Sequence, residues 1–337
     1  MSAQNADPAD SNPSRGAGSG TKTAKNPQNS GSVAALAAIT TTADVGELSK
    51  RIIGNVEQAI VGKRKQLVLS LVTWFSGGHI LLEDVPGVAK TMLARALARS
   101  VGCKFKRVQC TPDLLPTDVT GTSIFNQKKS QFEFRPGPVF TQILLADEIN
   151  RATPRTQASL LEAMAEARVT VDGNTHALEP PFVVIATQNP VDHEGTFPLP
   201  EAQLDRFMFI INVSYPTMEE EVEIATTTTS GVRPEMNIVL NAQQVQKFQQ
   251  LVPSVPVSKH VAEYAVKLAQ SSRPNKNGVA LGFINEWVDW GAGPRASQYL
   301  LMGAKARALM DNRVAATIED VKRVSRQVLE HRIILNF

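Results

Sequence analysis

Glu83-Asp84-Val85-Pro86-Gly87-Val88-Ala89-Lys90-Thr91 is the stretch from which the fold can be predicted. It follows a short apolar run at residues 79–82, which predicts a buried strand, and precedes a helical apolar pattern at residues 91–100. A strand, a tight loop ending in Lys-Thr and a helix form the context of a phosphate-binding loop. Lys90 would then reach the β- and γ-phosphates of a nucleotide, and the Thr91 hydroxyl would be a ligand of Mg²⁺.

The loop departs from the strict phosphate-loop pattern at both glycine positions, which are held by Asp84 and Ala89. Ala89 still supplies a backbone N–H, whereas a carboxylate at Asp84 would repel phosphate if it pointed toward it. Gly87 leaves one loop position free to adopt positive φ. The alternative is an ordinary strand-turn-helix with a surface lysine. The residues that would surround the phosphates, largely through backbone N–H groups, are Pro86, Gly87, Val88, Ala89, Lys90, Thr91 and Met92.

Two further apolar runs end in polar residues that suit nucleotide chemistry. Residues 143–146 are followed by Asp147 and Glu148, and residues 183–187 by Gln188 and Asn189. The carboxyl ends of parallel strands are where open sheets bind ligands. We therefore expect Asp147 to hold Mg²⁺ through water beside Thr91, Glu148 to act as general base on the attacking water, and Asn189 to bind the γ-phosphate or that water. Alternatively, the acids only cap a strand and Asn189 is a turn residue before a proline.

Apolar runs and helical patterns alternate along the middle of the chain, which predicts an α/β fold. Five strands without polar alternation, separated by helices, indicate a parallel five-stranded sheet covered on both faces. Helical periodicity alone continues after Tyr215-Pro216, so a smaller all-α lid domain is expected there. The predicted strands are residues 79–82, 105–109, 143–146, 182–187 and 208–213. The predicted domains are 1–44, a disordered low-complexity tail; 45–216, the α/β nucleotide-binding domain; and 217–337, the helical lid.

Composition excludes several other classes of protein. The chain has 337 residues, 42% of them hydrophobic, which is enough for one or two cored domains, and no apolar run approaches the ~20 residues of a membrane span. Two cysteines in no metal pattern favour a reducing compartment, and we expect a cytoplasmic protein. The net charge of +3 is too small to indicate nucleic-acid binding. The basic run Lys104, Lys106 and Arg107 and the pair Lys128-Lys129 are interpreted as solvated faces or loop tips.

The combined motifs resemble the MoxR branch of the AAA+ ATPases over about residues 45–337. The resemblance implies that Asn189 is the sensor 1 residue, Arg206 an arginine finger and Arg295 the sensor 2 residue, while Val61 and Gly62 lie on the adenine side. It further implies ATP and Mg²⁺ as cofactors and insertions at 117–137 and 168–181 that face a pore or a client. The strings that carry it are EDVPGVAKT, TPDLLPTDVTGT, FEFRPGPVF, LLADEINRATPRTQASLLEAM, VIATQNP, LPEAQLDRF and GAGPRA.

The resemblance also implies partners. A MoxR-like ATPase is expected to hydrolyse ATP in a hexameric ring and to act as a chaperone or remodelling motor on a protein client, with a von Willebrand A-type domain partner. Three alternatives stay open. One is a nucleotide-gated assembly module with little turnover, the second a nucleic-acid motor, and the third a magnesium-chelatase-like ATPase subunit.

Overall fold

The structure, a computed structural model, describes residues 42–84, 90–189, 195–229, 235–274 and 282–336. The predicted phosphate-loop residues Pro86, Gly87, Val88 and Ala89, and the predicted tail up to residue 41, lie outside these ranges. Helix α2 (Thr42–Glu57) begins within the last three residues assigned to the tail.

Five parallel strands form the central sheet, in the order β2-β5-β8-β1-β9. This confirms the predicted parallel five-stranded sheet, and each strand lies within two residues of its predicted bounds. The strands are β1 (Ile80–Asp84), β2 (Phe105–Gln109), β5 (Ile143–Asp147), β8 (Val183–Gln188) and β9 (Phe209–Val213). Because all of them run in the same direction, their carboxyl ends meet at one edge.

The two faces of the sheet pack into two separate cores. Ile80 and Leu82 point into one core, and Leu81 between them points into the other, as the period of a strand requires. The first core includes side chains of α2, α3 (Arg64–Phe75) and α4 (Lys90–Ser100). The second is built with α6 (Pro154–Glu166). Both faces are covered, which explains the near-continuous apolar runs in the sequence.

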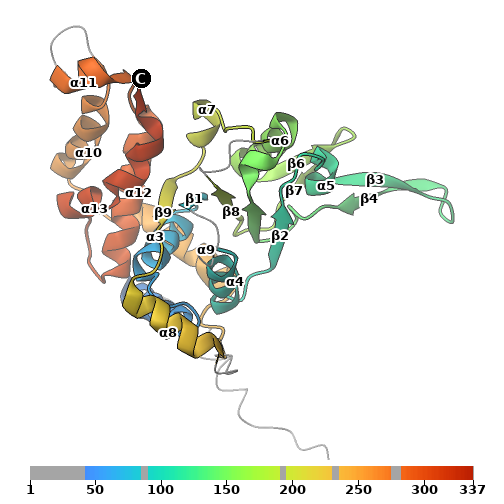
Figure 1. Cartoon of the computed structure of the whole chain (residues 1–337), viewed down its shortest axis with the longest axis horizontal. Coiled ribbons are helices and arrows are strands. Elements are labelled where there is room, and N and C mark those ends of the chain that lie inside the picture. Colours follow the sequence, from blue (N-terminus) through green and yellow to red (C-terminus); the bar gives the residue numbers. More distant parts are fainter. Residues whose placement is uncertain (1–41, 85–89, 190–194, 230–234, 275–281, 337) are drawn as a thin grey trace, which may run out of the picture. The chain divides into compact units, whose positions relative to one another are not determined.

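Two hairpins interrupt the α/β alternation where insertions were expected. Helix α5 (Pro116–Thr120) leads into the antiparallel pair β3 (Gly121–Asn126) and β4 (Gln131–Pro136), and β6 (Arg168–Val171) pairs with β7 (Asn174–Ala177). Figure 1 shows the hairpin β3–β4 extending away from the sheet.

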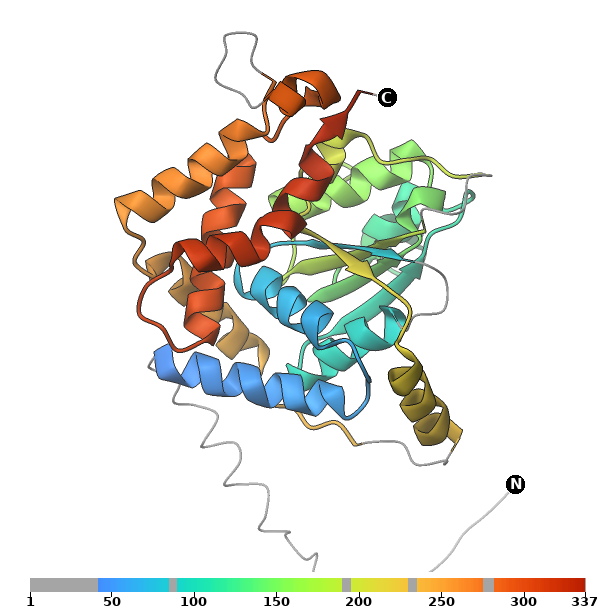
Figure 2. The ribbon, with the colours of Figure 1, turned by 60° about the vertical axis from the view of Figure 1, so that its left-hand side comes forward.

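The chain after β9 is mainly helical, as predicted, and also contains a two-stranded ribbon. Figure 2 shows α12 and α13 next to each other, with α2 and α3 nearby. Residues 39–337 form one compact unit, so the boundary at 216/217 stays a prediction. Helix α8 was not predicted from the sequence, because none of its side chains is buried and it lacks an apolar stripe. The elements are α7 (Glu201–Leu204), α8 (Met218–Thr229), α9 (Ala242–Leu251), α10 (Lys259–Ser271), α11 (Gly282–Trp287), β10 (Val288–Trp290), α12 (Pro294–Met310), α13 (Ile318–Leu329) and β11 (Ile334–Leu335), with short 3-10 turns η1 (Ile149–Arg151), η2 (Val252–Ser254) and η3 (Glu330–Arg332).

Within the described ranges, every helix is too short or too polar to cross a lipid bilayer.

We expect Phe248→Ala to reduce the free energy of unfolding by about 3–5 kcal/mol. Phe248 of α9 is fully buried and meets Phe75 of α3 edge to face, with ring centroids 5.0 Å apart. Phe132→Ala is the matched control, because that ring is 73% exposed on the hairpin β3–β4 and its loss should cost less than about 1 kcal/mol. Urea denaturation measures both, and equal losses would contradict the packing described.

Candidate nucleotide-binding site

The Asp147 carboxylate at the end of β5 receives hydrogen bonds from two neighbouring elements. Thr187 of β8 donates its hydroxyl to Asp147 Oδ1 at 2.7 Å. Thr91, the second residue of α4, places its hydroxyl 3.4 Å from Asp147 Oδ2. The structure therefore brings the start of the helix that carries Lys90 and Thr91 to the acid pair, as the sequence predicted. Met92 follows on the same helical turn, with 54% of its surface exposed.

Glu148 adopts a left-handed backbone, with φ of 58° and ψ of 52°, as the chain turns from β5 into η1. Such a conformation is uncommon for a residue other than glycine and is found mostly where the surroundings impose it. Here the backbone N–H of Glu148 donates to the Thr187 hydroxyl at 2.8 Å. One threonine thus orients both the expected metal ligand and the expected base.

Strand β2 contributes two side chains that sequence reasoning missed. Arg107 donates to Asp147 Oδ2 through Nε at 2.9 Å and Nη2 at 2.6 Å. Its side chain is 44% exposed, which agrees with a solvated face, but the sequence did not reveal its ion pair with Asp147. Its Nη2 also donates to Gln109 Oε1 at 2.6 Å. Gln109 in turn donates to Glu148 Oε2 at 2.9 Å, an oxygen that also lies 3.2 Å from Arg151 Nε. Both residues could have been assigned to the site if β2 had been predicted to pair with β5. That pairing places Arg107 and Gln109 beside the strand that ends in the acids.

Asn189 follows β8 directly and is buried at the same sheet edge. Its carbonyl accepts from Asn150 Nδ2 at 3.3 Å, which ties the end of β8 to η1. Beside it, Gln188 Nε2 donates to Glu83 Oε1 at 2.9 Å and links β8 to β1. The sequence thus placed Asn189 at the correct edge.

Arg206 and Arg295 have partners within the chain. Arg206 Nη1 donates to the Leu161 carbonyl of α6 at 2.6 Å, rather than pairing with the adjacent acid. Arg295, in the first turn of α12, pairs with Asp205 Oδ2 at 2.8 Å. Asp205 Oδ1 accepts from Arg332 Nε at 2.7 Å. Asp205 therefore links the segment that carries Arg206 to two parts of the helical region.

Arg332 is the second residue that the sequence did not reveal. Its side chain is 2% exposed, donates to the carbonyls of Asp205 and Phe207, and lies 5.1 Å from the centroid of the Tyr299 ring. A guanidinium with this many acceptors is well suited to hold chain segments together. No local pattern signals it, because all of its acceptors except the Val328 carbonyl lie more than 120 residues earlier in the sequence.

The expected adenine-side segment is the turn between α2 and α3. Gly62 has φ of 74°, and the Glu220 carboxylate of α8 lies where a side chain at Gly62 would begin. Next to it, the buried Lys63 donates through Nζ to the Ser214 carbonyl after β9 at 2.9 Å. Val61 and Gly62 are thus held beside the ends of β9 and the start of α8.

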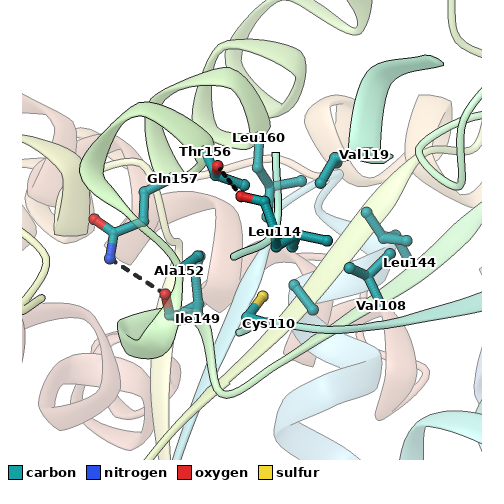
Figure 3. A pocket seen from close by; sticks show the side chains of 11 residues that line it. Val108, Cys110, Leu114, Val119, Leu144, Ile149, Ala152, Thr156, Gln157 and Leu160 are labelled. Atoms are coloured by element: carbon teal, nitrogen blue, oxygen red, sulfur yellow. Dashed lines mark hydrogen bonds between the residues drawn. The ribbon is translucent and has the colours of Figure 1, made fainter. Parts of the chain in front are cut away.

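Cys110 lies close behind the acids but does not supply a reactive thiolate. Burial, followed by the negative charges of Asp147 and Glu148, raises the pKa of Cys110 to about 12. Figure 3 shows its sulfur among apolar side chains, which line a cavity of about 10 Å³, near the space of one water molecule. We therefore expect the Cys110 thiol to stay protonated near neutral pH.

Comparison with known proteins identifies the family. Residues 79–209 match the ATPase family associated with various cellular activities (AAA), and residues 284–337 match the AAA lid domain. The chain is 44% identical to the uncharacterised protein YeaC of Bacillus subtilis over 87% of this chain and 89% of the relative. It is 42% identical to Chaperone MoxR1 of Mycobacterium tuberculosis (86% and 76%) and 31% identical to Protein MoxR of Methylorubrum extorquens (83% and 85%).

This chain belongs to the MoxR family of AAA+ ATPases. A crystal structure of a candidate ATPase from Cytophaga hutchinsonii has the same fold, with a TM-score of 0.81 and 39% identity over 88% of this chain and 90% of that one. MoxR membership makes the chain an ATP-hydrolysing P-loop enzyme and confirms the predicted AAA+ α/β fold with a helical lid.

The described residues at the sheet edge fit a nucleotide-bound Mg²⁺. Mg²⁺ prefers hard oxygen ligands and usually takes one or two from the protein and the rest from phosphates and water. The Thr91 hydroxyl and the Asp147 carboxylate supply oxygens of that kind next to each other. Among the described residues, no group of three or more His, Cys, Asp or Glu side chains is placed to hold a metal ion.

We expect Thr187→Val to lower ATP turnover by ~10–100-fold, because small misplacements of catalytic groups have effects of this size. The valine keeps the shape but removes the hydroxyl that Asp147 and the Glu148 N–H both use. It should also cost ~1–3 kcal/mol of stability through the unpaired buried N–H. Thr187→Ser is the control and should retain most of the activity. Steady-state phosphate release and thermal unfolding test this, and unchanged turnover in the valine variant would remove Thr187 from the site.

Proposed function

We propose that this MoxR ATPase binds ATP with Mg²⁺ at the carboxyl edge of the sheet and hydrolyses it in a ring of like subunits in the cytoplasm. The observation that carries the proposal is the convergence on Asp147 of hydroxyls from α4 and β8, with Glu148 next in the chain. Thr91 and Asp147 are proposed to bind the metal, and Lys90 with residues 86–89 and Met92 to bind the phosphates. Val61 and Gly62 would border the adenine.

Glu148 is proposed as the general base for the attacking water. Gln109 and Arg151 hold its carboxylate by one oxygen, Oε2, so that the other oxygen can accept a proton. Asn189, a neutral amide at the end of β8, is proposed to orient that water or the γ-phosphate without altering the local charge.

Arg206 is proposed to complete the site of a neighbouring subunit, and Arg295 to bind the phosphates from the lid. A permanently charged planar guanidinium stabilises charge that develops on a transferring phosphoryl group. Both side chains are held inside the chain, Arg206 by the Leu161 carbonyl and Arg295 by Asp205. Each would therefore exchange an internal acceptor for phosphate when the ring closes on nucleotide.

The work done with ATP is proposed to be the remodelling of a protein client. A relative 42% identical to this chain is named a chaperone. On the hairpin β3–β4, Phe125 and Phe132 are 50% and 73% exposed beside Lys128 and Lys129, and such exposed aromatic rings suit contact with partly unfolded chains. A hexameric ring and a von Willebrand A-type domain partner are part of the proposal.

We expect Glu148→Gln to bind ATP with nearly unchanged affinity and to hydrolyse it ~10²–10⁴-fold more slowly, the usual contribution of a general base. Fluorescent-nucleotide titration measures binding, and phosphate release measures turnover. Glu166→Gln, which removes an exposed acid paired with Arg168, is the control and should match the wild type. Normal turnover in Glu148→Gln would exclude the base role.

Mixing two inactive variants tests whether sites are shared. Arg206→Ala alone should lose ~10³-fold or more in turnover if the arginine acts as a finger. In mixed rings, a Glu148→Gln subunit would offer its intact Arg206 to the intact Glu148 of an Arg206→Ala subunit, so activity should reappear and peak near equal proportions. Failure of every mixture, with subunit exchange verified by a fluorescence label, would show that Arg206 serves its own subunit or only the fold.

A further inference from the structure

The oxygen assigned to the metal is also the acceptor of a guanidinium. Asp147 Oδ2 lies 2.9 Å from Arg107 Nε and 2.6 Å from Arg107 Nη2 and is the oxygen nearest the Thr91 hydroxyl. A cation that approaches this oxygen meets a positive charge already hydrogen-bonded to it, and like charges at such distances repel strongly. The other oxygen, Asp147 Oδ1, accepts the Thr187 hydroxyl at 2.7 Å, and Oδ2 is the oxygen that the Thr91 hydroxyl approaches.

We propose that Arg107 is a positioning residue that competes with Mg²⁺ for Asp147 Oδ2, so that the metal binds only as the guanidinium withdraws. The inference rests on the proposed function, since it takes Thr91 and Asp147 as the metal ligands. It adds that Arg107 of β2 sets the Mg²⁺ concentration at which the site is half filled.

Burial explains why the carboxylate needs a counter-ion. The Asp147 side chain is 10% exposed, and a carboxylate removed from water is costly unless it is paired. Arg107 meets that need with two N–H donors aimed at one oxygen. Its own side chain is 44% exposed, so it can move into water when a divalent cation takes its place. The exchange replaces one charged partner with another and never leaves Asp147 unpaired.

The guanidinium has a second acceptor on its own strand that limits where it can move. Arg107 Nη2 donates to Gln109 Oε1 at 2.6 Å, and the two residues project from the same side of β2. Arg107 can therefore leave Asp147 while it keeps Gln109. The competition predicts a change in metal affinity without loss of the strand pairing β2–β5.

The test is an equilibrium titration that requires no turnover. A fluorescent, non-hydrolysable ATP analogue is bound to the full chain at a fixed concentration while Mg²⁺ is varied from an EDTA baseline. We expect Arg107→Gln to lower the Mg²⁺ concentration at half-maximal signal by about two- to fivefold, the range set by a half-exposed ion pair. Arg107→Lys, which keeps the charge but loses the two-donor geometry, should fall between Arg107→Gln and the wild type.

Lys106→Gln is the matched control. It removes one positive charge from the neighbouring position of β2, where Lys106 is exposed and lies 3.4 Å from the Gly137 carbonyl rather than near Asp147. Its Mg²⁺ midpoint should equal that of the wild type. An equal shift in Lys106→Gln and Arg107→Gln would reduce the effect to general charge and overturn the competition.

Thermal unfolding supplies a second measurement if Arg107→Gln is unstable. Removal of the counter-ion should lower the melting midpoint without Mg²⁺, and Mg²⁺ with nucleotide should then stabilise the variant more than it stabilises the wild type. An unchanged or higher Mg²⁺ midpoint in both Arg107 variants would overturn the inference while leaving the metal site intact. If the wild type instead bound the nucleotide equally well with and without Mg²⁺, both the metal site and the inference would be overturned.

Discussion

A carboxylate that is nearly removed from water is the constraint on which the site depends. Asp147 is the last residue of β5, which lies between β2 and β8 in the sheet. Its side chain is buried, so its partners come from adjacent elements. Its partners come from three of them: Thr91 from α4, Arg107 from β2 and Thr187 from β8. Because an unpaired buried charge is costly, these contacts couple the start of α4 to the register of the three strands.

The same constraint sets the geometry of the neighbouring acid. Thr187 has one hydroxyl, which donates to Asp147 and accepts from the Glu148 N–H, so the chain must turn sharply after β5. The left-handed backbone of Glu148 is the result, and its carboxylate accepts from Gln109. Strain at a single residue is thus stabilised by a partly buried hydrogen bond, and two adjacent acids acquire different surroundings and different proposed roles.

Burial decides how much of this could be predicted from the sequence. The five strands were predicted because both faces of the sheet are covered and the runs are apolar, and the residues that follow them, such as Asp147 and Asn189, could therefore be assigned to one edge. The ion pair of Arg107 with Asp147 was missed because β2 is an edge strand of the sheet, where charged residues are usually interpreted as solvated. Helix α8 and Arg332 were missed for opposite reasons. The helix buries nothing, and Arg332 is buried by partners that are distant in the sequence.

Asp205 links the segment before β9 to the helical region through two arginines, Arg295 and Arg332. The two arginines differ in burial, and therefore in how easily each can leave Asp205. Arg332 is 2% exposed and binds several backbone carbonyls as well, so it anchors η3 to the segment before β9. Arg295 is 47% exposed and has Asp205 as its acceptor at the surface, where an ion pair contributes little. A competing anion can therefore draw Arg295 away while Arg332 keeps Asp205, and with it the backbone that carries Arg206, in place. In the proposed mechanism, the start of α12 would then respond to nucleotide while the segment that carries Arg206 keeps its position.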